Sequence, residues 1–578
     1  MKRILILILG VLAIVLCASA CSKNNSQSES RQTDGDQEEP KESVTVYDRY
    51  DINTYLKPFW EGKIVYNETV MFVGEDDKAP LMYNADEIIS VRSYDLTTEY
   101  EEGVDYVYDK KTNSIMLTAD TNIPYLTVEE YYPSSSRTDG PAACTFPCTR
   151  SEYNYIWFQE GNYFSSKQIA VTYRHSGTTY LAAPDECSSE FNEQVERLQN
   201  KNNAKILFFG DSITVGANAS SYIGYGPYAQ TWTWMVYDKL VDHYGLSATY
   251  YNYAVGGRTT QQGIDNMTAV KDDSGNTVDL KFAMPDGKKY SCVPDMLFLA
   301  FGMNDGTLSV NAHISKIQQI AETVLEANPN CIICLVSTML PNSEVVGFYG
   351  NQVYYHEKYA QLAQTLENKY EHKIFFADVT KEHIDLLKYK RYYDCTANNV
   401  NHPNDFISRL YAQTVLYTLC GDDYMNGGSD VKRPEQWDAR RETIIWRSFD
   451  QLYAIDEYGT YIADLFAPGQ SDSWDNVADM SGISSDKLVY WGWVSVKGEL
   501  GTFGYKIDGE SAVYDDGFTN YDETLLSVYT QLGGDTGSRM RIVIDLSEVS
   551  TTSDIAVLYK DTQGREFILS IFTVVGHK

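Results

Sequence analysis

Lysine and arginine are scarce in this chain. Its 578 residues carry 47 basic and 80 acidic side chains, which gives a formal net charge of −33. Proteins that bind nucleic acid need clustered lysine and arginine to neutralise phosphates, so the composition excludes nucleic acid as a partner. The negative charge is typical of a soluble domain that is held away from an anionic surface.

Long apolar runs are missing beyond the first 20 residues. A basic start precedes an apolar run at residues 4–16, which is shorter than the roughly 17 residues that a membrane-spanning helix needs. Small residues at 18–20 then lead to Cys21, and this pattern predicts a signal peptide. A cysteine directly after such residues resembles the bacterial lipobox, which implies that Cys21 becomes the lipidated first residue. An ordinary signal peptide with an incidental cysteine is the alternative.

Residues 22–43 contain no aliphatic or aromatic side chain. Such a segment cannot bury enough surface to offset the entropy of ordering, so it predicts a disordered tether. Together with residues 1–21 as a lipoprotein signal peptide, this predicts an extracellular protein. A lipid at Cys21 would anchor it to the bacterial cell membrane.

Cysteine and histidine do not occur in a metal-binding arrangement. No CxxC pair recurs beside histidines, so no zinc site is predicted, and we expect neither a metal nor a cofactor. Cys144 and Cys148 lie in a loop-like segment and could pair, although spacing does not decide this. Cys331 and Cys334 fall inside an apolar run and are interpreted as buried strand residues.

Three patterns follow one another after the tether. Residues 44–187 contain short β-branched or aromatic segments separated by Asp, Asn and Gly, which predicts an N-terminal β domain. Residues 188–425 alternate apolar strands with helical segments. Residues 430–578 return to strand patterns, which predicts a C-terminal β-sandwich domain.

The middle segment has the pattern of an α/β domain. Its expected strands are apolar along their whole length, which means that both faces of the sheet are covered and predicts a parallel sheet between helices. We expect strands at residues 205–209, 249–254, 296–301, 331–337 and 373–378, and helices at 227–240, 315–327 and 404–419.

Four polar blocks follow these strands or precede the last helix, where active sites of open parallel sheets form. The blocks are GDSIT (210–214), AVGGRTT (254–260), FGMNDG (301–306) and NNVNHPND (398–405). Acyl transfer needs a nucleophile, a base and donors for the oxyanion. Ser212 lies in a turn just after a strand, and His402 lies beside a helix start. Four other histidines sit on or beside helical stretches and are expected to face solvent: His313, His356, His372 and His383.

The four blocks in this order resemble the SGNH/GDSL hydrolase superfamily. The resemblance covers about 235 residues and implies an α/β, flavodoxin-like three-layer domain, here flanked by β-sandwich-like domains. It also implies Ser212 as nucleophile and His402 as base. The oxyanion hole would comprise the backbone N–H groups of Ser212 and Gly257 and the side chain of Asn304.

One position departs from the family pattern. Members usually carry aspartate three residues before the catalytic histidine, and here that residue is Asn399. Some SGNH esterases, including carbohydrate esterase family 2, work with a dyad in which a backbone carbonyl orients the histidine. We therefore expect a Ser-His dyad in which Asn399 or a carbonyl orients His402. Asp394 and Asp405 are alternative sources of a carboxylate, although neither has the family spacing.

These features predict an extracellular serine esterase that removes small acyl groups, acetyl above all, from carbohydrate through an acyl-enzyme. The substrate would be an acylated polysaccharide or oligosaccharide, and the chain's 46 tyrosines offer flat apolar faces suited to sugar rings. A lipase or phospholipid acylhydrolase is the enzymatic alternative. A catalytically decayed surface binding protein is the non-enzymatic alternative, with Asn399 as its best support.

Overall fold

The computed structural model describes residues 44, 46, 50–140, 142–177, 181–285, 287–426, 443–466, 477–520, 534–547, 549 and 552–577. All described residues except residue 44 belong to one compact unit, Val46–Lys578. The predicted signal peptide, the lipidation site Cys21 and the tether lie outside the described residues.

The middle part of the chain forms an α/β region. Its helices are α3 (Ser188–Gln199), α4 (Ser212–Val215), α5 (Trp232–Tyr244), α6 (Thr260–Asn266), α7 (Val310–Ala327), α8 (His356–Tyr370), α9 (Val379–Leu386), α10 (Asp405–Cys420) and α11 (Asp423–Asn426). Its strands are β9 (Ala204–Gly210), β10 (Ala248–Asn252), β11 (Met267–Lys271), β12 (Thr277–Ala283), β13 (Lys289–Ser291), β14 (Met296–Ala300), β15 (Ile332–Val336) and β16 (Phe375–Ala377).

Five of these strands make one parallel sheet in the order β10-β9-β14-β15-β16. The predicted parallel sheet is thus confirmed. Numbered within the sheet, the order is 2-1-3-4-5, the flavodoxin-like arrangement, in which ligands bind where the strand order reverses. That point lies at the carboxyl end of β9, between β10 and β14.

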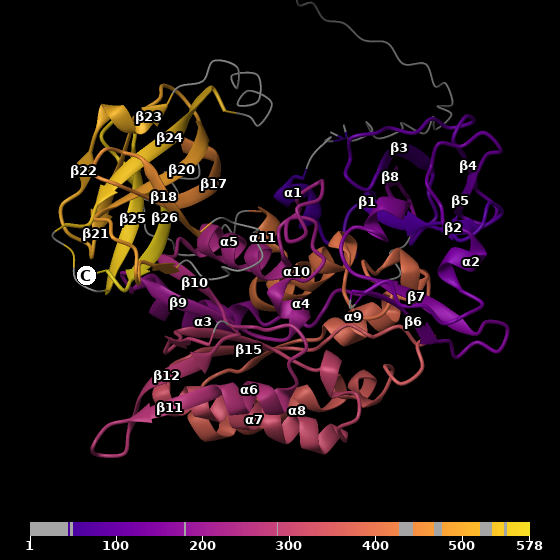
Figure 1. Cartoon of the computed structure of the whole chain (residues 1–578), viewed down its shortest axis with the longest axis horizontal. Coiled ribbons are helices and arrows are strands. Elements are labelled where there is room, and N and C mark those ends of the chain that lie inside the picture. The colour runs from indigo at the N-terminus through magenta and orange to yellow at the C-terminus, as the bar shows by residue number, and fades with distance from the viewer. Residues whose placement is uncertain are drawn as a thin grey trace, which may run out of the picture. The chain divides into compact units, whose positions relative to one another are not determined.

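Alternate side chains of the strands enter two different cores. Phe208 and Phe298 pack into the cluster that contains α5 and α10, whereas Leu207 and Leu297 pack into the cluster that contains α7 and α8. Figure 1 shows α5 and α10 on one side of the sheet and α6, α7 and α8 on the other. This three-layer arrangement explains why the strands are apolar at every position.

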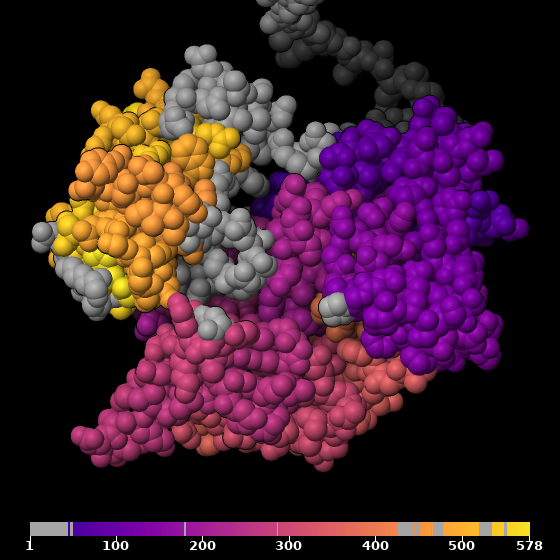
Figure 2. Space-filling model, viewed as in Figure 1, coloured from indigo at the N-terminus to yellow at the C-terminus, as the bar shows by residue number. Residues whose placement is uncertain are grey.

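A second, antiparallel sheet of β11, β12 and β13 is inserted between α6 and β14. The sequence pattern did not predict it, because its strands mix polar with apolar residues and are mostly only partly buried. Its β11–β12 turn projects from the surface, as Figures 1 and 2 show.

The N-terminal part is rich in strands, as predicted. It contains α1 (Ile52–Tyr55), β1 (Ile64–Met71), β2 (Lys78–Pro80), β3 (Glu87–Ser93), β4 (Tyr106–Asp109), β5 (Ser114–Leu117), α2 (Val128–Tyr131), β6 (Ala143–Pro147), β7 (Tyr155–Gln159) and β8 (Gln168–Arg174). These strands form three small sheets, β1-β8-β3, β2-β5-β4 and β6-β7. Side chains from β1 and β8 share one hydrophobic cluster with α5 and α10 of the α/β region, so the two parts have a common core.

The described C-terminal part is also β-rich. Its strands are β17 (Ile444–Ile455), β18 (Tyr461–Phe466), β19 (Val477–Asp479), β20 (Lys487–Val496), β21 (Thr502–Ile507), β22 (Val513–Tyr514), β23 (Thr519–Asn520), β24 (Thr536–Asp545), β25 (Thr552–Lys560) and β26 (Glu566–Val575). They form two five-stranded sheets, β18-β17-β20-β24-β23 and β19-β26-β25-β21-β22. Buried side chains of both sheets meet in a single hydrophobic cluster.

Cys144, Cys148, Cys331 and Cys334 form no disulfide. Cys331 and Cys334 are buried at strand β15, as their apolar surroundings predicted. Within the described residues, no helix is both long and apolar enough to cross a membrane.

Candidate active site

Ser212 lies at the reversal point of the parallel sheet, on the first turn of α4 directly after β9. Gly210 permits this turn, because a Cβ atom there would lie 2.1 Å from the carbonyl oxygen of Ala300 on the neighbouring strand. The side chain of Asp211 caps α4 by accepting the N–H of Ile213 at 3.0 Å. The serine hydroxyl is thereby held on a short, fixed segment.

His402 meets this serine from a distant part of the chain. Its Nε2 lies 2.9 Å from the Oγ of Ser212. Both residues are largely buried, with 5% of the surface of Ser212 and 9% of that of His402 exposed. The structure therefore brings together the two residues that the polar blocks singled out.

Asn398 shapes the loop that carries His402. Its Oδ1 accepts the backbone N–H groups of Val400, Asn401 and His402, each at 3.0 Å. A single buried side chain thus satisfies three successive donors and fixes the backbone of the histidine.

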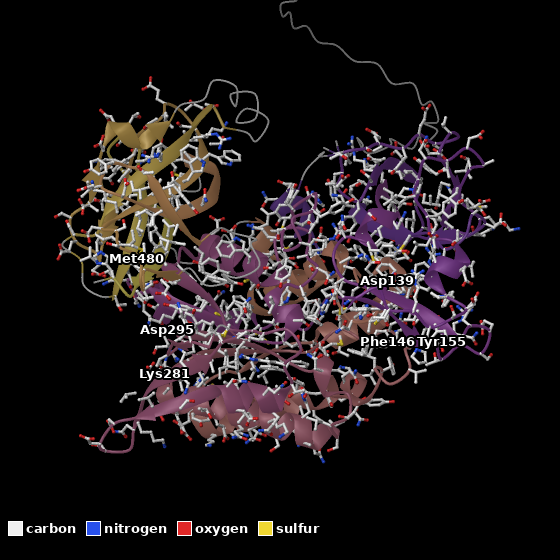
Figure 3. All side chains as sticks on the ribbon, in the orientation of Figure 1. Asp139, Phe146, Tyr155, Lys281, Asp295 and Met480 are labelled. Carbon is white, nitrogen blue, oxygen red and sulfur yellow. The ribbon has the colours of Figure 1, made fainter. Side chains whose placement is uncertain are left out.

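Two side chains contact the other ring nitrogen of His402. Its Nδ1 lies 2.8 Å from Oδ1 of Asn218 and 3.1 Å from Oε2 of Glu160. Asn218 follows α4, whereas Glu160 follows β7 in the N-terminal part. Strands β6 and β7 form a two-stranded ribbon, on which Figure 3 labels Phe146 and Tyr155.

Asn399 does not contact the imidazole, which corrects the hypothesis that it orients His402. Its Oδ1 accepts the hydroxyl of Tyr131 at 2.7 Å, and its Nδ2 donates to the carbonyl of Trp157 at 2.8 Å. The residue has a left-handed backbone with φ of 68°. Its amide is therefore bonded to the N-terminal part instead of the histidine.

Asp394 and Asp405 are not histidine partners either. Asp394 is buried and binds the guanidinium of Arg391 at 2.9 Å and the N–H of Met71, also at 2.9 Å. Asp405 accepts the N–H of Ser220 at 2.9 Å. Burial raises the pKa of Asp405 to about 6.

The turn that carries Gly257 lies beside Ser212. A Cβ atom on Gly256 would lie 3.9 Å from the Cβ of Ser212, and Gly257, with φ of 75°, is exposed in the same turn. The Nδ2 of Asn304 donates to the carbonyl of Arg258 at 3.0 Å, which links this turn to the residues after β14. Among the described residues, the N–H groups of Ser212 and Gly257 have no hydrogen-bond partner. Both remain able to donate to a substrate oxygen.

Asp211 is a further ionisable group at the site. It is buried, and burial raises its pKa to about 7 against the stabilising N–H groups of Ile213 and Met303. Its second oxygen accepts the N–H of Met303 at 3.3 Å. Asp211 thus ties the nucleophile turn to the segment that carries Asn304.

Residues 208–410 match the GDSL-like Lipase/Acylhydrolase family. This segment belongs to the SGNH/GDSL hydrolase superfamily. The resemblance carried by the four polar blocks is thereby confirmed, and membership supports a carboxylic ester hydrolase. No curated protein matches the chain.

Several solved structures are similar to part of this chain. A member of the lipolytic protein G-D-S-L family from Veillonella parvula is 20% identical, with 37% of this chain and 96% of that chain covered and a TM-score of 0.25. A carbohydrate esterase family 3 protein from Talaromyces cellulolyticus is 14% identical, with 40% and 100% covered and a TM-score of 0.26. A Clostridium thermocellum family 3 carbohydrate esterase is 16% identical, with 37% and 94% covered and a TM-score of 0.26. At these TM-scores the likenesses carry no conclusion about substrate.

Two of the histidines expected to face solvent are buried instead. His313 stacks on Tyr355, with ring centroids 3.9 Å apart. His383 accepts the N–H of Leu340 through Nδ1 at 3.0 Å, and burial lowers its pKa to about 3. Both lie on helix faces that pack inward, so they serve the core and not the site.

The sequence did not predict the roles of Asn218, Asn398 and Glu160. Asn398 stands in the same polar block as His402, and Asn218 lies six residues after the nucleophile, so each had a weak local signal. Glu160 had none, because it is 242 residues away from His402 along the chain.

Proposed function

We propose that this SGNH/GDSL chain is an extracellular serine esterase that removes acetyl and other small acyl groups from carbohydrate. The 2.9 Å contact between Ser212 and His402 at the reversal point of the sheet carries the proposal. The contact pairs a nucleophile with a base where α/β enzymes bind ligands.

In this mechanism the Oγ of Ser212 attacks the ester carbonyl while Nε2 of His402 takes its proton. The carbonyl oxygen becomes an oxyanion, which the N–H groups of Ser212 and Gly257 and the amide of Asn304 stabilise. The imidazolium then protonates the departing sugar oxygen and leaves an acyl-enzyme. His402 then deprotonates a water molecule that attacks the acyl-enzyme, and the resulting imidazolium returns the proton to the departing Oγ of Ser212, so the carboxylic acid is released and the free enzyme restored.

The polarity of the site supports a carbohydrate substrate. The side chains that contact His402 or hold its loop are one carboxylate and two amides: Glu160, Asn218 and Asn398. Such groups match sugar hydroxyls, which are both donors and acceptors, better than a long acyl chain. The side chain of Glu160 is 31% exposed, so part of this polar set can meet a ligand.

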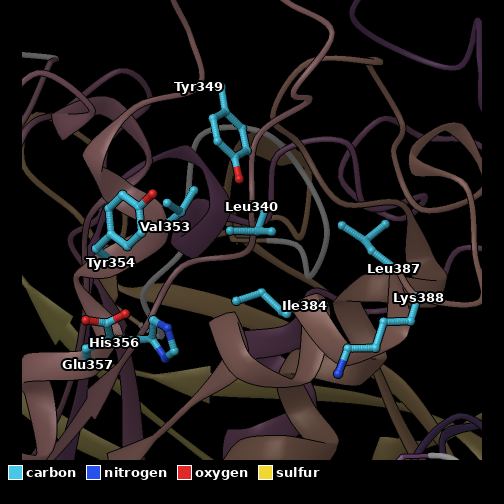
Figure 4. Close-up of a pocket in the computed structure, with 9 residues that line it drawn as sticks. All are labelled: Leu340, Tyr349, Val353, Tyr354, His356, Glu357, Ile384, Leu387 and Lys388. Atoms are coloured by element: carbon cyan, nitrogen blue, oxygen red, sulfur yellow. The ribbon is translucent and has the colours of Figure 1, made fainter.

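One observation favours the alternative of a lipid acylhydrolase. Figure 4 shows a pocket whose wall includes four aliphatic side chains, Leu340, Val353, Ile384 and Leu387. Its lining residue Leu340 lies two residues before Asn342, which donates to the carbonyl of Asn399 in the histidine loop at 2.8 Å. None of the lining residues forms a hydrogen bond with Ser212 or His402, so we assign the pocket no part in the acetylesterase mechanism.

The chain's active-site contacts argue against a decayed binding protein. In a decayed site the hydroxyl of Ser212 and the imidazole of His402 would have no reason to stay within hydrogen-bond distance of each other. The substitution at Asn399, the best support for decay, is explained by its bonds to Tyr131 and Trp157.

Attachment to the membrane through Cys21 remains part of the proposal. It is supported by the apolar run and small residues before Cys21. Labelled fatty acid should be incorporated into the wild-type chain and not into Cys21→Ala. A wild-type chain that is never labelled would contradict lipidation.

The activity is tested with acetylated polysaccharide and with p-nitrophenyl esters of increasing chain length. Wild-type protein should release acetate and prefer acetyl to octanoyl esters, and Ser212→Ala should lose about 10⁴-fold or more in kcat. Ser274→Ala, in the exposed β11–β12 turn, is the matched control and should keep full activity. Preference for octanoyl esters would favour the lipid alternative. Activity that survives in Ser212→Ala would reject the nucleophile.

A further inference from the structure

The carboxylate of Glu160 reaches the catalytic histidine from outside the SGNH/GDSL region. Its Oε2 lies 3.1 Å from Nδ1 of His402, and its Oε1 accepts the Nδ2 of Asn398 at 3.1 Å. Each oxygen thus has a separate partner on the histidine loop, so both the position and the orientation of the carboxylate are fixed.

Asn218 decides which ring nitrogen of His402 carries the proton. Its Nδ2 donates to the carbonyl of Gly161 at 3.2 Å, so its Oδ1 must be the atom that faces Nδ1 of His402 at 2.8 Å. An amide oxygen and a carboxylate only accept hydrogen bonds. Nδ1 is therefore the protonated nitrogen, and Nε2 is left to accept the proton of Ser212.

From these contacts we propose that Glu160 is the carboxylate that positions His402 and balances the charge of its imidazolium during acyl transfer. The inference rests on the proposed function. It places in the N-terminal β region the role for which SGNH/GDSL members commonly use the aspartate that Asn399 replaces here. Asn218 holds the ring orientation, and Glu160 adds the negative charge that an amide lacks.

The environment of Glu160 keeps it ionised. Burial opposes ionisation, but the nearby His402 and the hydrogen bonds from Asn398 and Asn218 outweigh it, so that the pKa of Glu160 is lowered. The other acid close to the pair, Asp211, bonds to the N–H groups of Ile213 and Met303 and not to the ring. Among the described residues, Glu160 is the carboxylate that contacts His402.

The arrangement makes the N-terminal part a component of the active site. Glu160 directly follows the β6–β7 ribbon, and its own N–H donates to the carbonyl of Ala142 at 2.8 Å. Arg391 of the α/β region binds Asp77 at 2.8 Å, which helps hold the two parts together. The active site is therefore complete only when the N-terminal part is packed against the α/β region.

The test uses the full chain and compares Glu160→Gln and Glu160→Asp with the wild type. Glu160→Gln should lower kcat by about 10²- to 10⁴-fold, as loss of a triad carboxylate does elsewhere, with KM changed by less than about threefold. Glu160→Asp keeps the charge and should retain at least about ten times the kcat of Glu160→Gln. The rate at which a fluorophosphonate labels Ser212, followed by mass spectrometry, should fall in parallel with kcat.

Two further variants separate charge from structure. Asn218→Asp, combined with Glu160→Gln, puts a carboxylate on the second Nδ1 partner and should recover at least about tenfold of the lost kcat. Tyr131→Phe removes a hydrogen bond between the same two parts of the chain without changing a charge. This control should lower the melting temperature and leave kcat within about twofold.

The outcomes distinguish this inference from the proposed function. A Glu160→Gln protein with kcat and labelling rate within about twofold of the wild type would overturn the role of Glu160 and leave the esterase assignment standing. Failure of both Glu160→Asp and the Asn218→Asp combination to recover activity would also overturn it. A wild-type protein that is labelled at Ser212 but hydrolyses no ester would reject the proposed function, and the labelling rates would still test Glu160.

Discussion

The hydroxyl of Tyr131 donates a hydrogen bond to Oδ1 of Asn399 at 2.7 Å, and both side chains are buried. The other end of the same amide donates to the carbonyl of Trp157 at 2.8 Å. Asparagine suits this position, because the position requires a side chain that both accepts and donates a hydrogen bond. An aspartate, the residue common in SGNH/GDSL relatives, has no hydrogen to offer the carbonyl.

This arrangement predicts the effect of Asn399→Asp. The new carboxylate oxygen would face the carbonyl of Trp157, so we expect a loss of about 1–3 kcal/mol in the free energy of unfolding. Because the side chain does not reach His402, kcat should stay within about threefold and the acidic limb of the pH–rate profile should not move. Urea unfolding and kinetics with p-nitrophenyl acetate measure the two effects.

Asn330→Asp is the matched control, since it adds the same charge at an exposed position. It should leave both stability and kcat unchanged. A rise in kcat of Asn399→Asp, or a shift of its acidic limb, would show that a carboxylate at this position reaches the imidazole after all.

A second prediction concerns Arg391, which contributes to the contact between the N-terminal part and the α/β region. Its guanidinium binds the buried Asp394 at 2.9 Å, Asp77 at 2.8 Å and the carbonyl of Met71 at 2.7 Å. Arg391→Ala would leave Asp394 its hydrogen bond from the N–H of Met71, but the nearest cation that pairs with it among the described residues would be the ammonium of Lys390, at 3.9 Å. We expect a loss of about 3–5 kcal/mol in the free energy of unfolding, measured by urea titration.

The control is Lys497→Ala, which breaks an ion pair with Asp535 in which both side chains are about half exposed. Exposed pairs contribute about 1 kcal/mol or less, so this variant should remain close to the wild type. Equal losses of unfolding free energy in the two variants would mean that the burial of Asp394 does not determine how much Arg391→Ala destabilises the protein.

Local patterns in the sequence predicted the parts of the site that lie at strand ends. Ser212 and the Gly257 turn directly follow buried strands, and parallel strands bring their carboxyl ends to one edge. His402 belongs to the block before the last helix, and family spacing was enough to find it. These residues could be located from the sequence because their places in the fold depend only on the order of strands and helices along the chain.

The remaining parts of the site depend on contacts between distant segments. Glu160 lies in a β ribbon with no catalytic pattern of its own, and only folding brings it to His402. Asn399 looked like a histidine partner by spacing, but Tyr131 and Trp157 determine where its amide points. The burial of His383 likewise follows from packing against Leu340, which helical spacing alone does not show.

Asn398→Ala tests how the histidine loop is held. The variant would leave the N–H groups of Val400, Asn401 and His402 without their common acceptor and would release Oε1 of Glu160. Buried donors without partners cost about 1–3 kcal/mol each, so we expect a large loss of stability together with a fall in kcat of about tenfold or more. Thermal unfolding and kinetics below the new transition temperature measure both. An active variant of wild-type stability would mean that the loop is held by other contacts.

The last prediction concerns Asp405, whose carboxyl is buried at the start of α10. Its Oδ1 accepts the N–H of Ser220, whereas Oδ2 has no hydrogen-bond partner among the described residues. Burial is the main cause that raises its pKa from 3.8 to about 6, against the stabilising contributions of Ser220, Tyr94 and Arg409. The folded state therefore holds the proton more tightly than the unfolded state.

For a carboxyl with a raised pKa, stability is greatest below the unfolded pKa and is lost as the pH rises through the folded pKa. Asp405 should thus lower the free energy of unfolding between pH 4 and pH 6 by about 1.4 kcal/mol for each pH unit. The amide that Asp405→Asn introduces has no proton to lose, so this variant should gain about 2 kcal/mol relative to the wild type when urea titrations at pH 4.5 and pH 7 are compared. The comparison cancels the effects of the other titrating groups, which both proteins share. A difference that stays constant with pH, or that shifts in favour of the wild type, would mean that Asp405 is ionised in the folded protein throughout this range.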